Sequence, residues 1–402
     1  MSPRVMRIVR SSAALLVAPV LVLLWGTAAA DSIRNPRTPA PSPDGTEIAF
    51  SYMGDIWVVS ASGGRAARVT VHEAYDDNPV WSPDGEVIAF DSDREGNGDV
   101  YVVPAGGGRP RQLTFHSAWD ALECWDAGGD GILFSSRRDT VESELFRASI
   151  DGGLPERVIR DRAYNAAVSP DGRWIAYVRG RTPWWRKHYR GSASRDIWIR
   201  ARAGGTSYRV VGWEGDDDRP MWGSDGKTLY FQSERSDSVS NVWKVSLDLP
   251  GPGEDGQPSA ARPPVQVTRH ERDGIQFAAI SADGSLIVYE WDGGLWALDL
   301  PGGEPRPIRV DAASDLKWNN RLRMRESSGA SEFALSPDES EIALVVRGEV
   351  YVASFEDGEI GDALRITSTP AREKDVVWMP DGETLLFASD RNGDYDLSLI
   401  HI

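Results

Sequence analysis

Histidine and glutamate stand together at two places where their spacing approaches a zinc-binding pattern. His72-Glu73 and His270-Glu271 match the first half of the His-Glu-x-x-His motif. The second histidine of that motif is missing, because an aspartate follows the first pair at that position and a glycine follows the second. Three of the five histidines occupy one slot of a repeat, beside an aspartate, so we expect them to form hydrogen bonds within turns.

Other arrangements that could support catalysis or hold a cofactor fail in the same way. Gly223-Ser224-Asp225-Gly226 has the wrong spacing for the Gly-x-Ser-x-Gly elbow of serine hydrolases. Asp93-x-Glu95-x-Asn97-Gly98 resembles a calcium loop, but the twelfth position is Pro104, which offers no carboxylate. No Gly-x-Gly-x-x-Gly precedes a predicted helix. The sequence therefore predicts no catalytic residue, no metal site and no cofactor.

Two groups of residues are candidates for substrate binding rather than for chemistry. Residues 181–190 form a basic and aromatic insertion that contains Trp184 and Trp185, and aromatic residues with arginine commonly anchor protein or peptide contacts. The alternative is that this insertion folds back on its own domain or packs against other modules. The second group is Arg137-Arg138, whose guanidinium groups could hold a carboxylate. A solvated surface pair is the alternative there.

The elements that must position these candidates belong to an internal repeat. Ser-Pro-Asp-Gly or a close variant recurs roughly 40 residues apart, a period typical of propeller repeats. It occurs around Asp44, Asp84, Asp130, Asp171, Asp225, Asp283, Asp338 and Asp381. Proline presets its own φ, aspartate accepts hydrogen bonds from nearby backbone N–H groups, and glycine adopts positive φ without a Cβ clash. The motif therefore predicts a turn between two strands.

The residues after each turn predict a four-stranded unit. A short apolar run such as 47–50 or 87–90 comes first, and a third strand then carries a large residue in a fixed slot. That slot holds Trp57, Tyr101, Phe146, Trp198, Trp243, Trp296, Tyr351 and finally Leu397. A glycine turn and a short fourth strand complete the unit. Four-stranded units at this spacing predict an all-β fold of propeller blades, with the aromatic residues packed between neighbouring blades.

The phase of the repeats suggests how the chain divides. Six complete units fit within residues 37–310, which predicts a six-bladed β-propeller closed by packing between its first and last blades, without a strand exchange. Residues 311–331 lack the pattern and are predicted to be a connector. Residues 332–402 are expected to form the first two blades of a second, incomplete propeller, the last of them cut within its pattern. The chain is then expected to be a fragment; one eight-bladed ring is the alternative.

Short sequence motifs that recur around the turns are similar to the propeller repeat of tricorn-type and TolB-type proteins. One is Leu113-Thr114-x-His116 followed by Asp120, and it recurs near 69–76 and 267–273. The C-terminal residues 347–395, with Arg365-Ile366-Thr367 and Ser389-Asp390-Arg391, resemble the opening of the second propeller of tricorn proteases. The resemblance covers roughly residues 37–399.

This resemblance implies that the chain is the non-catalytic, substrate-gating propeller part of a tricorn-type serine peptidase that degrades peptides. The parent would continue into the rest of the second propeller, a PDZ-like module and a peptidase core, and would form a homo-oligomer. The family uses an arginine pair from its six-bladed propeller to hold a peptide's terminal carboxylate, a role that would fall to Arg137 and Arg138. The alternatives are a stand-alone, TolB-like protein-binding propeller and the propeller of a prolyl-oligopeptidase-like peptidase.

The composition and the N-terminal residues limit where the protein can be located and which partners it can bind. The formal charge of −17 argues against nucleic acid and against an anionic membrane surface as partners, which leaves peptides or other protein modules. Residues 1–30 resemble a signal peptide, with three arginines before the apolar run 13–25 and Ala28-Ala29-Ala30 for cleavage. We therefore expect export to the periplasm or medium, with an uncleaved anchor as the alternative. The single cysteine, Cys124, excludes an intrachain disulfide.

Overall fold

The computed structural model describes residues 33–235, 239–251, 254, 256–313 and 328–402. The chain divides into two compact units, Met1–Asp315 and Leu316–Ile402. The predicted signal peptide, residues 1–30, lies outside the described residues, as does most of the predicted connector. Within the described ranges the regular elements are all β-strands, and no helix there is long and apolar enough to cross a membrane.

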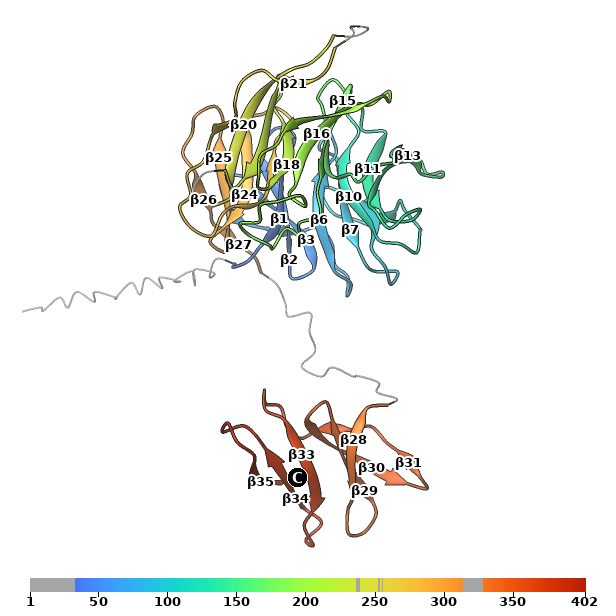
Figure 1. Ribbon diagram of the computed structural model, residues 1–402. Helices are drawn as coiled ribbons and strands as arrows, with labels where there is room; N and C mark the ends of the chain where they lie inside the picture. The colour runs from blue at the N-terminus through green and yellow to red at the C-terminus, as the bar shows by residue number, and fades with distance from the viewer. Residues whose placement is uncertain (1–32, 236–238, 252–253, 255, 314–327) are drawn as a thin grey trace, which may run out of the picture. The chain divides into compact units, whose positions relative to one another are not determined.

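The described residues of the first unit form six consecutive antiparallel sheets, each built from neighbouring segments of the chain (Figure 1). The first three are β1(Arg37–Pro41)–β2(Glu47–Tyr52)–β3(Asp55–Ser60)–β5(Ala67–Arg68), β6(Asp76–Trp81)–β7(Val87–Ser92)–β8(Asp99–Pro104)–β9(Arg111–Gln112), and β10(Asp120–Trp125)–β11(Gly131–Ser136)–β12(Glu144–Ser149)–β13(Glu156–Ile159). The next three are β14(Tyr164–Val168)–β15(Trp174–Arg179)–β16(Asp196–Ala201)–β17(Ser207–Val211), β18(Asp217–Trp222)–β19(Thr228–Ser233)–β20(Asn241–Asp248) with β21(Ser259–Ala260) and β22(Val265–Gln266), and β23(Gln276–Ile280)–β24(Leu286–Trp291)–β25(Gly294–Asp299)–β26(Arg306–Ile308).

The Ser-Pro-Asp-Gly motif forms the turn between the first two strands of a sheet through local hydrogen bonds. In the first sheet the hydroxyl of Ser42 donates to Asp44 at 2.6 Å and accepts the N–H of Glu47 at 2.9 Å. Asp44 also accepts the N–H of Thr46, and Gly45 takes a φ of 69°. The hydrogen bond from Ser42, followed by that from Thr46, lowers the pKa of the Asp44 carboxyl. Because all these bonds lie within five residues, the motif determines the turn locally.

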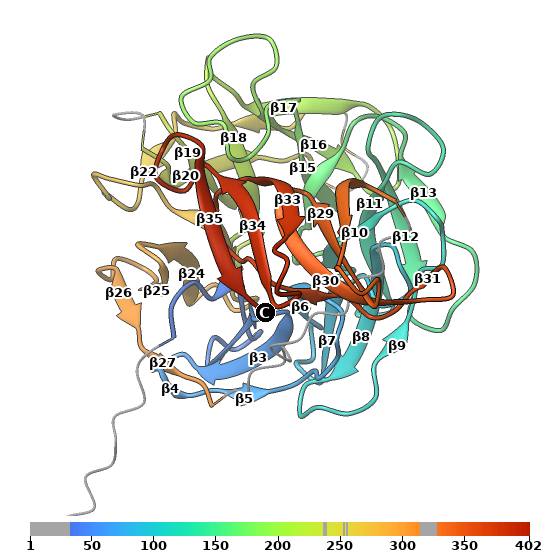
Figure 2. The ribbon, with the colours of Figure 1, turned by 90° about the horizontal axis from the view of Figure 1, so that it is seen from below.

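The six sheets follow one another around a circle, which is the arrangement of a β-propeller (Figure 2). The first strands of consecutive sheets contact each other, from β1 to β6, β10, β14, β18, β23 and back to β1. A cluster of buried apolar side chains lies between each pair of neighbouring sheets. The cluster between the sixth and the first sheet includes Phe50, Trp57 and Val288. The core is therefore divided among the gaps between sheets.

The circle closes without an exchange of strands between the first and last sheets. All strands of the first sheet come from residues 37–68 and those of the sixth from 276–308. A short parallel pair adds to the closure, since β27(Val310–Asp311) lies beside β4(Gly64–Arg65). The N–H of Ile33 also donates to the carbonyl of Val310 at 2.9 Å. These backbone hydrogen bonds join the two ends of the circle. The sequence analysis did not predict this pairing.

The described part of the second unit contains two sheets of the same kind. The first consists of β28(Ala330–Leu335), β29(Glu341–Val346) and β30(Glu349–Glu356), with the short strands β31(Glu359–Ile360) and β32(Leu364–Arg365). The second has three strands, β33(Glu373–Trp378), β34(Thr384–Ser389) and β35(Asp396–His401). Buried residues that include Val345, Val352 and Phe387 join the two sheets.

Candidate functional site

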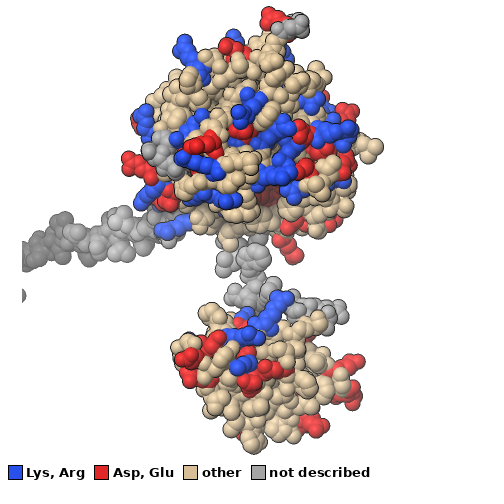
Figure 3. Space-filling model, in the orientation of Figure 1, with Lys and Arg blue, Asp and Glu red and all other residues tan. Residues whose placement is uncertain are grey.

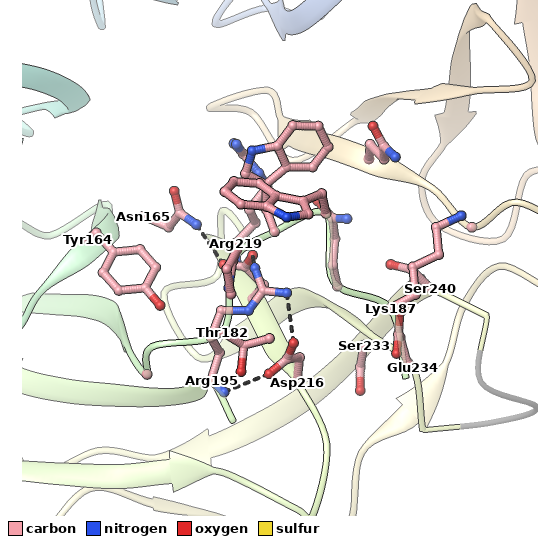
Figure 4. A pocket seen from close by; sticks show the side chains of 18 of the residues that line it. Tyr164, Asn165, Thr182, Lys187, Arg195, Asp216, Arg219, Ser233, Glu234 and Ser240 are labelled. Atoms are coloured by element: carbon pink, nitrogen blue, oxygen red, sulfur yellow. Dashed lines mark hydrogen bonds and ion pairs between the residues drawn. The ribbon is translucent and has the colours of Figure 1, made fainter. Parts of the chain in front are cut away.

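A cavity of about 760 Å³ lies among the third to sixth sheets of the first unit. The first strands of the six sheets form the inner ring of the propeller. The cavity walls come from loops that follow second strands, which supply residues such as Arg137, and from this inner ring, which supplies Asn165 and Phe277. The insertion between β15 and β16 supplies Trp184 and Trp185. Figure 4 shows part of this lining. Loops from four sheets thus converge at one end of the inner ring.

The insertion between β15 and β16 is held across neighbouring sheets by hydrogen bonds. The ammonium group of Lys187 donates to the carbonyl of Asp273 at 3.0 Å, and the N–H of His188 donates to Glu234 at 2.9 Å. The ring of Trp184 packs edge-on against Phe277 of β23 at 5.4 Å between centroids. The insertion therefore folds back on its own domain, while Trp184 and Trp185 keep exposed fractions of 50% and 68%.

Part of the cavity wall is a network of charged side chains around Arg195. Its guanidinium forms ion pairs with Asp216, at 2.9 Å, and with Asp218 (Figure 4). Burial alone lowers the pKa of Arg195, but Asp218 and Asp216 outweigh it and raise that pKa. The Asn165 amide also donates to Asp218 at 2.6 Å. The two carboxylates are thus already compensated by Arg195.

Glu123, in the first strand of the third sheet, is a carboxylate whose protonation depends strongly on its surroundings. Glu123 accepts the N–H of Ala166 from the next sheet at 3.0 Å. Burial raises its pKa to about 7, although hydrogen bonds from Ser135 and Ala166 and the charge of Arg219 oppose this. Glu123 therefore changes charge near neutral pH while it links two sheets.

The two candidate arginines have different environments. Arg137 is exposed and lines the cavity. Arg138 instead donates to Asp120 at 2.6 Å, and its guanidinium stacks over Phe134 and Phe146 at 4.9 Å. The structure thus separates the pair, because only Arg137 is available to a ligand in the cavity.

The ion pair of Arg138 is a feature of the repeat. The same pairing, with the acid 18 residues before the arginine, joins Asp76 to Arg94, Asp217 to Arg235 and Glu373 to Arg391. Each of these arginines also lies over an aromatic ring of its own sheet. The regular spacing was visible in the sequence and could have identified Arg138 as a structural residue.

Sequence reasoning missed Arg219 and Phe277, which line the cavity from β18 and β23. Both sit at β-bulges with positive φ, 48° for Arg219 and 51° for Phe277. A signal for Arg219 did exist, because Asp217-Asp218-Arg219-Pro220 repeats the phrase Asp76-Asp77-Asn78-Pro79 with arginine in place of asparagine. An arginine at a position where three other sheets have a small polar residue marks a departure from the repeat.

The histidines and the cysteine that could have taken part in catalysis or metal binding form hydrogen bonds within the fold or are buried in it. His72 and His116 each accept, through Nδ1, the N–H of the residue two positions on, at 3.0 Å. These are turn hydrogen bonds of the predicted kind, whereas the third histidine of the slot, His270, forms a hydrogen bond with the Tyr289 hydroxyl through Nε2 at 3.0 Å. Burial raises the pKa of the Cys124 thiol, so it is no thiolate nucleophile near neutral pH. Among the described residues, no group of three or more His, Cys, Asp or Glu is placed to hold a metal ion.

Residues 37–304 match the model of a family described as the tricorn protease N-terminal beta propeller domain. Tricorn protease homolog 1 of Streptomyces coelicolor is 28% identical over 377 residues, which are 87% of this chain and 33% of the homolog. The tricorn protease homolog of Saccharolobus solfataricus is 24% identical, over 79% of this chain and 28% of the homolog. A crystal structure of the tricorn protease superposes with a TM-score of 0.69 at 18% identity, covering 92% of this chain and 34% of that one. This chain thus spans about a third of the length of these relatives.

Proposed function

Because this chain belongs to the tricorn protease N-terminal β-propeller family, we propose that it is the non-catalytic, substrate-handling part of an exported tricorn-type serine peptidase. In this proposal residues 37–310 are a six-bladed propeller, and residues 332–402 begin a second propeller. The peptidase chemistry belongs to other parts of a longer parent, which degrades peptides as a homo-oligomer. The cavity among the third to sixth sheets then admits peptides.

The observation that carries this proposal is the cavity at one end of the inner ring. Its walls combine aromatic rings, from Trp184, Trp185 and Phe277, with the exposed cation of Arg137. Aromatic and arginine side chains are those that most often anchor peptide and protein contacts. The insertion supplies both tryptophans and folds over neighbouring sheets, so a displacement of this loop would change access to the cavity. This supports a gating role.

The surface of the first unit supports peptides rather than a uniformly charged polymer as the partner. Lysine and arginine side chains alternate with aspartate and glutamate on the face that Figure 3 shows. Many arginines of the first unit are paired with carboxylates, as Arg162 and Arg181 are with Glu142. A surface on which basic and acidic side chains are mixed and paired differs from the extended basic region that follows a nucleic acid backbone.

The gating role is tested by replacing both tryptophans of the insertion with alanine in a full-length parent enzyme. The rings are half or more exposed, so their loss costs little folding free energy, while peptide retention should fall about tenfold because the aromatic wall is gone. Trp119→Ala is the matched control, since Trp119 is 59% exposed and lies away from the cavity lining. Retention that stays unchanged in the double variant would refute the role of the insertion.

Arg137 is tested separately, by Arg137→Gln in the same parent. Turnover of peptides with a free C-terminus should fall about tenfold, since a charge-assisted hydrogen bond is lost, while turnover of C-terminal amides should not change. Arg138 is left in place because its ion pair with Asp120 stabilises the third sheet. If the variant treats both kinds of peptide as the parent does, Arg137 does not contact the terminal carboxylate.

A further inference from the structure

The bulge in the first strand of a sheet places one residue with positive φ next to the inner ring. In five sheets of the described first unit this residue is Thr38, Asn78, Asn165, Arg219 or Phe277, with φ between 46° and 53°. Such a backbone is uncommon for residues other than glycine and must be held by its surroundings. At Arg219 this backbone conformation is stabilised by a hydrogen bond from the backbone N–H of Arg219 to the Asp218 carboxylate at 2.8 Å.

The polar residues at these bulges have their side chains satisfied by neighbouring sheets, with one exception. The hydroxyl of Thr38 donates to Asp77 at 2.5 Å, the amide of Asn78 donates to the carbonyl of Leu122 at 2.7 Å, and the amide of Asn165 donates to Asp218. The guanidinium of Arg219 makes no hydrogen bond or ion pair with any residue that the structure describes. Arginine carries five N–H donors, so this group is left with unused capacity.

The carboxylate nearest in sequence to Arg219 is occupied by another arginine. Asp218 pairs with Arg195, which also pairs with Asp216. Burial lowers the pKa of Arg219, while the charges of Asp218, Glu123 and Glu290 oppose this shift. A guanidinium that is desolvated, yet not directly paired, gains most from an anion that enters the cavity.

Aromatic rings surround this cation. Arg219 stacks over Phe277 at 4.4 Å from the ring centroid, and Phe277 in turn contacts Trp184 at 5.4 Å. Arg37 lies over the same two rings, but its own charge is already paired with Glu290 at 3.0 Å. A ligand carboxylate at Arg219 would therefore have an apolar wall beside it, where a hydrophobic side chain can pack.

We propose that Arg219 binds a peptide carboxylate in this cavity, with a neighbouring apolar or aromatic side chain of the peptide against Phe277 and Trp184. The carboxylate belongs either to the C-terminus or to an aspartate or glutamate side chain, since the guanidinium recognises both. This inference rests on the proposed function, in that it takes peptides as the molecules that enter the cavity. It names the substrate class of that site as acidic or free-ended peptides with an apolar residue.

The test measures binding of short peptides to this whole chain by calorimetry and needs no peptidase activity. Three probes separate the sources of the carboxylate: acetyl-Leu-Phe as free acid, acetyl-Leu-Phe as amide, and acetyl-Glu-Phe as amide. We expect acetyl-Leu-Phe as free acid, or acetyl-Glu-Phe as amide, to bind at least tenfold more tightly than acetyl-Leu-Phe amide, because only the first two carry an anion. Tighter binding of the acid identifies the C-terminus, and tighter binding of the glutamyl amide identifies the side chain.

Arg219→Gln should lower this preference while Arg137 remains in place, and should leave the weak binding of the uncharged amide unchanged. Arg186→Gln is the matched control, because Arg186 also stacks on an aromatic ring, that of Tyr189, but does not line the cavity. Thermal unfolding verifies that each variant is folded, and the acid–amide comparison on the unaltered chain stands even where a variant is not. Equal binding of all three probes, or an undiminished preference in Arg219→Gln, would overturn the assignment but leave the role of the insertion in gating intact. Absence of any peptide binding would contradict both.

Discussion

The third sheet of the first unit and the last sheet of the second unit are built from the same repeat, yet their side chains have different environments. In the third sheet, Phe134 is fully buried and Phe146 is 3% exposed, because the second sheet packs against them. In the last sheet, Leu397 occupies the slot of Phe146 and is 76% exposed, and Leu399 is 63% exposed. The repeat thus determines that a strand forms, whereas a neighbouring sheet determines whether its apolar residues are buried.

The sharpest way to test this comparison is to remove a large side chain from each sheet. Phe134→Ala should lower the free energy of unfolding of the first unit by about 3–5 kcal/mol, because it leaves a cavity between two packed sheets. Leu397→Ala should change the free energy of unfolding of the second unit by less than about 0.5 kcal/mol, because the side chain is already in water. Denaturant unfolding of the two variants measures both. Equal losses would mean that the last sheet is covered in solution.

The repeated ion pair provides a second test with a smaller expected effect. Asp120→Ala should cost the first unit about 3 kcal/mol, since it leaves the guanidinium of Arg138, with a side chain only 11% exposed, without its partner. Glu373→Ala in the last sheet should cost about 1 kcal/mol, because Arg391 is 40% exposed and can be hydrated. The double variant Asp120→Ala with Arg138→Met should be more stable than Asp120→Ala alone. If it is less stable, the cost does not come from an unpaired charge.

The smallest expected effect concerns pH. The pKa of Glu123 is raised by burial to about 7, so the folded state binds its proton more tightly than the unfolded chain does. This contribution to stability is fully present below the ordinary glutamate pKa and is lost as the pH rises toward 7. The first unit should therefore become less stable between about pH 5 and pH 7 relative to Glu123→Gln, whose side chain does not titrate. Thermal unfolding across this range measures the difference, and parallel curves for the two proteins would contradict it.

Much of the fold was predictable because the repeat carries its own local chemistry. In the turn at Ser42–Gly45 the hydrogen bonds join residues no more than five apart, so such turns and the strands beside them could be predicted from the spacing of the motif. The candidate site was predicted only in part. Trp184, Trp185 and Arg137 were recognised because they depart from the repeat, whereas Phe277 looks like an ordinary strand residue until its bulge places it beside Arg219.

The sequence by itself determined the hairpin turns, the four-stranded units and their order, because these depend on hydrogen bonds and apolar alternation between residues close in the chain. Only the tertiary structure decided that Arg138 is held by Asp120 while Arg137 lines the cavity. It also decided that Arg219, Phe277 and Trp184 meet in one cavity. Such contacts join residues of different sheets, and closing the circle of sheets is what brings those residues together.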